Sequence, residues 1–177
     1  MNCRYIFLMM VLGLTGCATP QPPDFTVRNV TPVKNKQQAE LRSITVVYDA
    51  NAKTNVAIGA FVPSNVDSAS LWREALTDAL NRSVAFQDDQ KLKVSLSVRI
   101  MEIDAHEFLR THLTITALYE VIDRATGKIL FKEVVEGTGI NDELMNRGRP
   151  KLMFEAAVRE NIRAFITALS EVQLVER

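Results

Sequence analysis

Two stretches of apolar–polar alternation constrain the fold of this 177-residue chain more than any other feature. Apolar residues occupy every second position in 92–101 and again in 113–122. Successive side chains of a β-strand point to opposite faces, so each stretch predicts a strand with one face on a core and one toward water. Residues 123–128 predict a turn that needs a left-handed residue at Gly127, followed by a returning strand over 129–135. This arrangement is typical of an antiparallel meander.

The remaining periodic segments supply two more strands and two helices. Alternation at 44–48 and 56–62, around a polar turn at 49–55, predicts two strands. Apolar residues recur at helical spacing over 71–84 and again over 154–169. We therefore expect an α+β fold: a two-layer sandwich in which an antiparallel sheet of about five strands, in the order β-β-α-β-β-β-α, is packed by two helices.

Local signals place the starts of both helices. Asp67 and Ser68 supply N-cap chemistry for the first, and Pro150 suits the first position of the second. Trp72 lies on the apolar stripe of the first helix, so we expect it to anchor the core rather than to stack on a ligand.

The amino terminus reads as an export signal over residues 1–16. Arg4 precedes an apolar run at 5–14, which is too short to cross a bilayer as a helix. The segment Leu14-Thr-Gly-Cys17 resembles the lipobox of bacterial lipoproteins. That resemblance implies that Cys17 is diacylated and becomes the first residue of the mature protein, and that Ala18 directs it to the outer membrane.

Residues 17–42 carry four prolines among polar residues and predict an extended tether between the lipidated Cys17 and a periplasmic domain at 43–177. Phe25, Val27 and Val30 interrupt this polar character, and they would pin the segment either to the domain or to a partner. No other apolar run approaches membrane-spanning length, so the predicted attachment to the membrane is through lipid alone.

Charge and cysteine content exclude several classes of protein. Lys plus Arg is 21 and Asp plus Glu is 21, and loss of Arg4 with the signal leaves a formal charge of −1. A nucleic-acid partner would normally require a basic excess, so none is expected. Cys3 leaves with the signal and Cys17 is acylated, so the mature domain has no thiol for catalysis, a metal or a disulfide.

No known catalytic motif is present, and we predict no catalytic residue, no cofactor and no metal. Gly137-Thr-Gly139 is better explained as a strand end or bulge than as a phosphate loop. His106 and His112, with Asp104 or Glu102, would form a metal site only if a hairpin brought them together, and solvated loop histidines are the simpler interpretation. The acidic pairs are interpreted as solvated, namely Asp88 with Asp89 and Asp142 with Glu143.

One cationic group is a candidate binding site. Arg147, Arg149 and Lys151 lie at the start of the last predicted helix, where free N–H groups and the helix dipole favour an anion. A lipid, lipopolysaccharide or cell-wall phosphate would fit such a site. Glu143 and Glu155 lie nearby and weaken its field.

The lipobox, the proline-containing tether and the segments 119–123, 126–128 and 156–162 together resemble small proteobacterial envelope lipoproteins of the YajG type. More loosely, they are similar to the lipopolysaccharide-assembly lipoprotein, the activator lipoprotein of penicillin-binding synthases and the amino-terminal domain of TolB. The resemblance implies an envelope role but transfers no active-site residue.

Three functions follow as hypotheses. The first is a non-enzymatic outer-membrane lipoprotein whose domain binds an envelope protein or glycan through a sheet edge, the cationic loop or the polar sheet face. That face carries Ser95, Ser97, Arg99, Thr114 and Thr116. The alternative is a carrier of lipid or a small ligand, which needs a pocket between helices and sheet. The third, an envelope hydrolase or transferase, lacks a nucleophile–base set.

Overall fold

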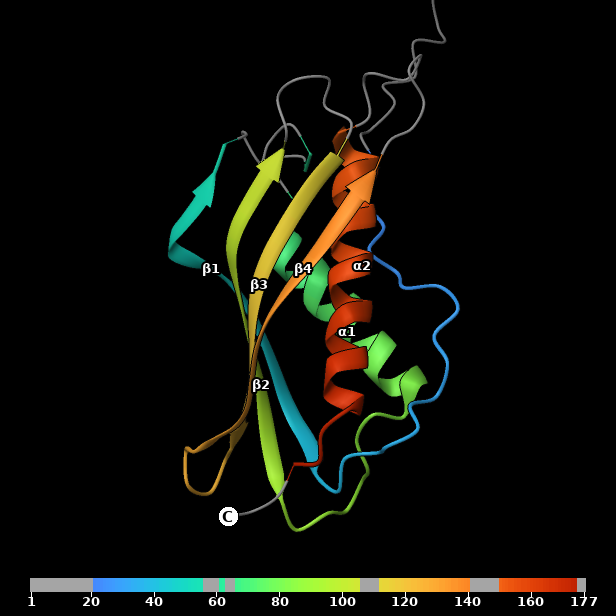
Figure 1. The fold of residues 1–177 in the computed structure, drawn as a ribbon, viewed down its shortest axis with the longest axis vertical. Coiled ribbons are helices and arrows are strands. Elements are labelled where there is room, and N and C mark those ends of the chain that lie inside the picture. The colour runs from blue at the N-terminus through green and yellow to red at the C-terminus, as the bar shows by residue number, and fades with distance from the viewer. Residues whose placement is uncertain (1–20, 56–60, 63–65, 106–111, 141–149, 175–177) are drawn as a thin grey trace, which may run out of the picture.

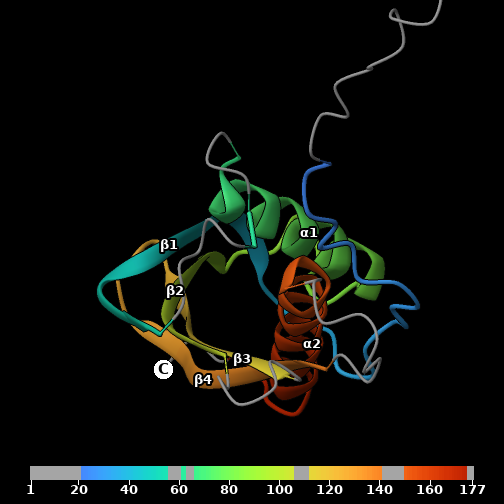
Figure 2. The same cartoon turned by 90° about the horizontal axis from the view of Figure 1, so that it is seen from above.

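Four strands form one sheet in the order β1-β2-β3-β4 (Figure 1). The computed structural model describes residues 21–55, 61–62, 66–105, 112–140 and 150–174. The elements are β1 (Glu40–Thr54), α1 (Ser68–Ser83), β2 (Lys93–Ala105), β3 (His112–Asp123), β4 (Ile129–Ile140) and α2 (Pro150–Ser170). Both helices lie on one side of the curved sheet (Figure 2). The α+β class and the single layer of two helices are therefore as expected.

Two expectations are wrong, and both concern β1. The order of the elements differs from the predicted one, and β1 does not pair antiparallel with its neighbour. The polar segment 49–55, expected to be a turn, continues β1 as far as Thr54, so β1 is one strand of 15 residues. Its register against β2 shifts between Tyr48 and Lys53, where the polar residues form an irregular stretch. Of the expected second strand, 56–60 lie outside the described residues, and Phe61 and Val62 are buried but not in a strand. The order is β-α-β-β-β-α.

β1 and β2 are parallel, whereas β2, β3 and β4 form the expected antiparallel meander. The difference follows from α1, which lies between β1 and β2 in the chain. A helix crossover returns the chain to the same end of the sheet, so the next strand runs in the same direction. The predicted turn is confirmed: the N–H of Gly127 donates to the carbonyl of Asp123 at 2.8 Å, and Gly127 has φ +72°.

The core fills the layer between the helices and the sheet. Asp67 caps α1 as expected, with its carboxylate accepting the N–H of Ala69 at 3.1 Å. Trp72 is 1% exposed, which confirms it as a core anchor. On the other helix, the ring of Phe165 stacks on Tyr119 with 4.1 Å between centroids. Burial of such aromatic side chains contributes roughly 1.5–3 kcal/mol each.

Two glycines let α2 approach β4 closely. Gly137 and Gly139 lie in the last four residues of β4, facing the helix. A Cβ on Gly137 would lie 2.3 Å from the carbonyl oxygen of Ala157, and one on Gly139 would lie 1.9 Å from that of Met153. Glycine inside a strand often marks a close approach of another backbone, and this contact explains both positions.

A buried polar network joins α2 to the sheet. Asn161 is fully buried, and its side-chain amide donates to the carbonyls of Ile115 on β3, at 3.1 Å, and Val135 on β4, at 2.8 Å. Its Oδ1 accepts the hydroxyl of Tyr119 at 2.7 Å. Burial raises the pKa of Tyr119 above its usual range, so this hydroxyl remains a donor at neutral pH.

Candidate functional site

The segment 21–39, which we call the strap, runs beside both helices (Figure 1). Phe25 is 3% exposed and Val27 is fully buried. The ring of Phe25 packs edge-on against Phe154 of α2, with 5.5 Å between centroids. Of the two alternatives for these residues, the structure therefore shows packing on the domain. The folded unit includes part of the segment that was expected to be a tether.

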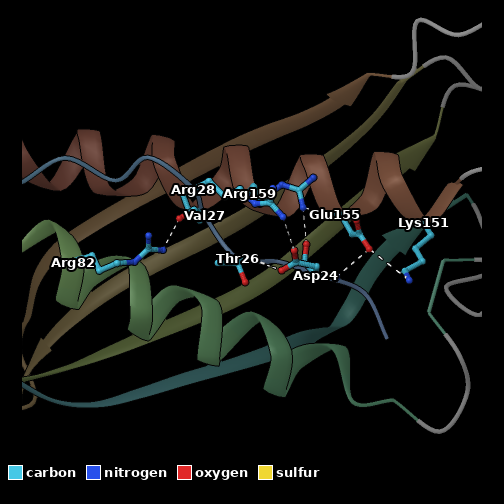
Figure 3. Close-up of polar contacts among 8 residues, drawn as sticks. All are labelled: Asp24, Thr26, Val27, Arg28, Arg82, Lys151, Glu155 and Arg159. Carbon is cyan, nitrogen blue, oxygen red and sulfur yellow. Dashed lines mark hydrogen bonds and ion pairs between the residues drawn. The ribbon is translucent and has the colours of Figure 1, made fainter. Parts of the chain in front are cut away.

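Basic side chains of the helices hold the strap by its backbone (Figure 3). The carbonyl of Asp24 accepts from Arg159 of α2 at 2.6 Å, and the carbonyl of Val27 accepts from Arg82 of α1. An extended segment outside a sheet has no ladder to satisfy its carbonyls, so these guanidinium groups supply the missing donors.

The far end of the strap closes the carboxyl end of α2. Gln37 is fully buried, and its amide donates to the carbonyls of Leu169 and Val172, each at 2.8 Å. Its Oε1 accepts the N–H of Leu174 at 2.9 Å. The last carbonyls of a helix have no partner within it, so Gln37 acts as a cap supplied by a distant part of the chain.

A nearly buried carboxylate organises the start of the strap. Glu155 accepts the backbone N–H of Asp24 at 3.0 Å and lies 3.8 Å from both Lys151 and Arg159. Lys151 also donates to the carbonyl of Gln21 at 2.6 Å. Hydrogen bonds from Thr26, with smaller contributions from Arg159 and Arg28, lower the pKa of the Asp24 carboxyl.

A groove of about 910 Å³ lies between the first residues of the strap and both helices. Its apolar lining includes Pro22, Phe25, Leu71 and Leu152. Its carboxylates are Asp24, Glu74, Asp78 and Glu155. Asp24 lies 3.6 Å from Arg28, Asp78 lies 2.5 Å from Arg82, and Glu155 is paired as above. The groove lies between the strap and the helices, whereas the carrier hypothesis expected a pocket between helices and sheet.

The sheet face opposite the helices is open over the described residues (Figure 2). Its hydroxyl-bearing side chains include Ser95, Ser97, Thr114 and Thr116. Charged groups cross all four strands: Glu120 of β3 lies 3.4 Å from Arg99 of β2 and 3.1 Å from Lys132 of β4, and Arg99 lies 3.8 Å from Asp49 of β1. Exposed Val47 and Val134 complete this surface, which we call the open face.

The structure describes only part of the predicted sites. Cys17, Arg147 and Arg149 lie outside the described residues. Lys151, the described member of the cationic group, bonds Gln21 and faces Glu155, so nearby groups of the chain already share its charge.

The hypothetical metal site is also only partly described, because His106 lies outside the described residues. His112 begins β3, and Asp104 lies on β2, where it accepts a hydrogen bond from Asn55. Across the ranges that the structure describes, no three His, Cys, Asp or Glu side chains gather in a geometry suited to a metal ion. None of the described helices has the length and apolar character needed to cross a bilayer.

Comparison with solved structures shows the fold. A Xanthomonas campestris protein of the family DUF330 is 12% identical, with a TM-score of 0.54 over 80% of this chain and 92% of its own. A PelC dodecamer from Paraburkholderia phytofirmans gives 10% identity and a TM-score of 0.47 over 79% of this chain and 95% of its own. A minor lipoprotein from Acinetobacter baumannii gives 11% identity and a TM-score of 0.42, with 73% and 92% covered.

The TM-score of 0.54 with the Xanthomonas campestris protein shows that this chain shares its fold. No protein-family model and no curated protein sequence matches this chain. At 12% identity this likeness shows the fold alone, so function has to be argued from the residues themselves.

Proposed function

We propose that the chain is a lipoprotein anchored through Cys17 to the periplasmic face of the outer membrane, where it acts as a non-enzymatic accessory module in cell-envelope assembly or transport. Its one-sided sheet carries this proposal. Both helices and the strap cover one face, and the open face remains available to an envelope protein or glycan. The resemblance of the lipobox and of the domain to YajG-type lipoproteins supports the same assignment.

The link between Cys17 and Phe25 limits how far the domain reaches from the membrane. The buried Phe25 lies eight positions after Cys17 in the chain. An extended chain spans at most about 3.3–3.6 Å per residue, so this link can reach no further than roughly 26–29 Å. The module therefore works close to the bilayer rather than at the end of a long arm.

The chemistry of the open face suits a polar partner. Serine and threonine hydroxyls both donate and accept hydrogen bonds, so they can match the hydroxyls of a glycan or the backbone of a protein. Glu120 is held between Arg99 and Lys132, which fixes the positions of three charges on this surface. Ion pairs of this kind add specificity and register more than affinity.

Site-specific photo-crosslinking in intact cells tests this proposal. A photoreactive residue at Ser97 or Thr116 reports on the open face, and one at Thr167, exposed on α2, is the matched control. We expect a discrete adduct from the two sheet positions and none from Thr167. Equal labelling at all three positions, or none at the sheet positions, would overturn the open face as the contact.

The cationic group is the alternative contact within the same proposal. Arg147→Ala combined with Arg149→Ala should weaken sedimentation of the protein with vesicles that contain anionic glycolipid, while Lys34→Ala on the strap should not. Unchanged sedimentation of the double variant would remove the anion site from the account.

The groove favours a second candidate, a carrier of lipid or a small ligand. Its volume and its apolar lining at Phe25, Leu71 and Leu152 are the observations in its favour. Native mass spectrometry of the protein purified from membranes tests this candidate. A co-purified ligand lost on Leu71→Glu would support it, and protein of bare mass would exclude it.

A further inference from the structure

β4 is an edge of the sheet with an exposed outer side. It is the last strand in the order β1-β2-β3-β4, and none of the described residues pairs with its outer side. Three consecutive residues near its centre, Lys132, Glu133 and Val134, are exposed, and Val134 is 52% exposed. Long exposed edges are templates for pairing with another strand, and proteins normally block them.

The turn shows which backbone groups of β4 face outward. The N–H of Asp123 donates to the carbonyl of Lys128 at 2.9 Å, so the backbone of Asp123 faces β4. Backbone direction alternates along an antiparallel pair, so the other odd-numbered residues of β3 also face β4. From Val121 to Leu113, the register pairs each odd-numbered residue of β3 with an odd-numbered residue of β4, as in Ala117 with Val135. The even-numbered residues of β4 therefore present free N–H and C=O groups outward.

These even-numbered residues carry a charge pattern that complements itself. Lys132, Val134 and Glu136 share the open face, with a cation and an anion at equal distances from the valine. In an antiparallel pair of two β4 strands related by a two-fold axis at Val134, each Lys132 lies opposite Glu136 of the second copy. Directly opposed residues have Cβ atoms about 4.5–5.5 Å apart, which allows an ion pair.

Other registers that use the same outward groups are disfavoured by charge. A two-fold axis at Lys132 opposes two lysines, and one at Glu136 opposes two glutamates. An axis at Glu133 opposes two glutamates on the inner side, and one at Val135 places Lys132 opposite Thr138. Like charges that are directly opposed destabilise strand pairing, so the axis at Val134 is the one that pairs unlike charges.

We propose that β4 pairs with β4 of a second copy of this chain, with the two-fold axis at Val134, so that two four-stranded sheets become one continuous sheet. The contact is isologous, as expected for a symmetric dimer. This inference is independent of the lipid anchor and of the partner at the open face.

Cysteine crosslinking of the full chain in its native membrane tests the register. Val134→Cys places two thiols opposite each other, so a short bis-maleimide should join two copies. Thr138→Cys lies on the same face of the same strand, but the two Thr138 positions would be about 26 Å apart at 3.3 Å per residue, so it should not crosslink. The unsubstituted chain is the control for any crosslinking through the native Cys3 and Cys17. Equal crosslinking of the two variants, or none from Val134→Cys, would overturn the proposal.

Charge exchange provides a second test that a folding defect cannot mimic. Lys132→Glu and Glu136→Lys alone should each oppose like charges and weaken dimerisation roughly tenfold or more in sedimentation equilibrium. A mixture of the two variants should form heterodimers, because both opposed pairs then attract, and the double variant should regain the homodimer. A wild-type protein that remains monomeric at every concentration, or single variants that dimerise as well as wild type, would contradict the proposal.

Discussion

At the scale of single residues, the contact between α2 and β4 depends on two missing side chains. A Cβ on Gly137 or Gly139 meets helix backbone rather than a flexible side-chain end. Gly139→Ala should therefore lower the free energy of unfolding by about 3 kcal/mol. Urea denaturation measures this change. Glu133→Gln, an exposed substitution on the same strand, should stay within about 0.5 kcal/mol. A Gly139→Ala variant with the same free energy of unfolding as wild type would contradict the close packing.

Asn161 provides a second prediction at this scale. Tyr119→Phe removes one hydrogen bond and leaves the buried Oδ1 of Asn161 without that donor. We expect a loss of about 1–3 kcal/mol in the free energy of unfolding. Asn161→Ala should cost more, because it leaves the Tyr119 hydroxyl without its acceptor and removes both bonds to the sheet. A Tyr119→Phe variant as stable as wild type would show that the network does not stabilise the fold.

The sequence predicted the positions of these residues but not their roles. Asn161 falls at a core-facing position of the helical stripe, and Gly137 and Gly139 follow the predicted returning strand, where they are interpreted as a strand end or bulge. Spacing alone does not show which element will approach a glycine, or which distant hydroxyl will satisfy a buried amide. Both facts arise only when α2 is placed on β3 and β4.

At the scale of secondary-structure elements, the hairpin turn between β3 and β4 predicts a pH dependence. Hydrogen bonds from the Thr126 hydroxyl and the N–H of Ala125 lower the pKa of Asp123 below its ordinary 3.8. A lowered pKa in the folded state stabilises the fold above the unfolded value, and the stabilisation is lost as pH falls through the folded value.

This contribution should be complete above about pH 5 and should decline as the pH falls below it. In urea denaturation between pH 7 and pH 2.5, Asp123→Asn should flatten this part of the stability curve. Glu133→Gln, which also removes one negative charge but lies outside the turn, is the control for the change in net charge. Identical acid dependence in wild type and Asp123→Asn would show that the turn does not contribute to it.

The elements also show where sequence reasoning succeeds and where it fails. Strict alternation over 92–101 and 113–122 identified β2 and β3 because their faces differ in polarity. The polar segment 49–55 was misassigned as a turn, because most of it lies at an exposed sheet edge, where a strand needs no apolar residues. The sequence predicts a pair of strands before the first helix, whereas the structure has only β1 there. The crossover through α1 therefore leads directly from β1 to β2 and makes these two strands parallel.

At the scale of the whole molecule, the strap should stabilise the fold. Phe25→Ala empties a buried site beside Phe154 and should cost about 3 kcal/mol in the free energy of unfolding. Arg28→Ala is the matched control, because its side chain is 80% exposed and its pairing with Asp24 should contribute little. Denaturation of both variants checks this. If Phe25→Ala were as stable as Arg28→Ala, the packing of the strap would not stabilise the fold.

The central claim at this scale is lipid anchoring through Cys17, and metabolic labelling with palmitate tests it most directly. The full chain should incorporate label and fractionate with the outer membrane. Cys17→Ser should lose both properties, and Cys3→Ser, the matched control, should keep them. A wild-type chain that takes up no palmitate and is recovered in the soluble periplasmic fraction would contradict the account.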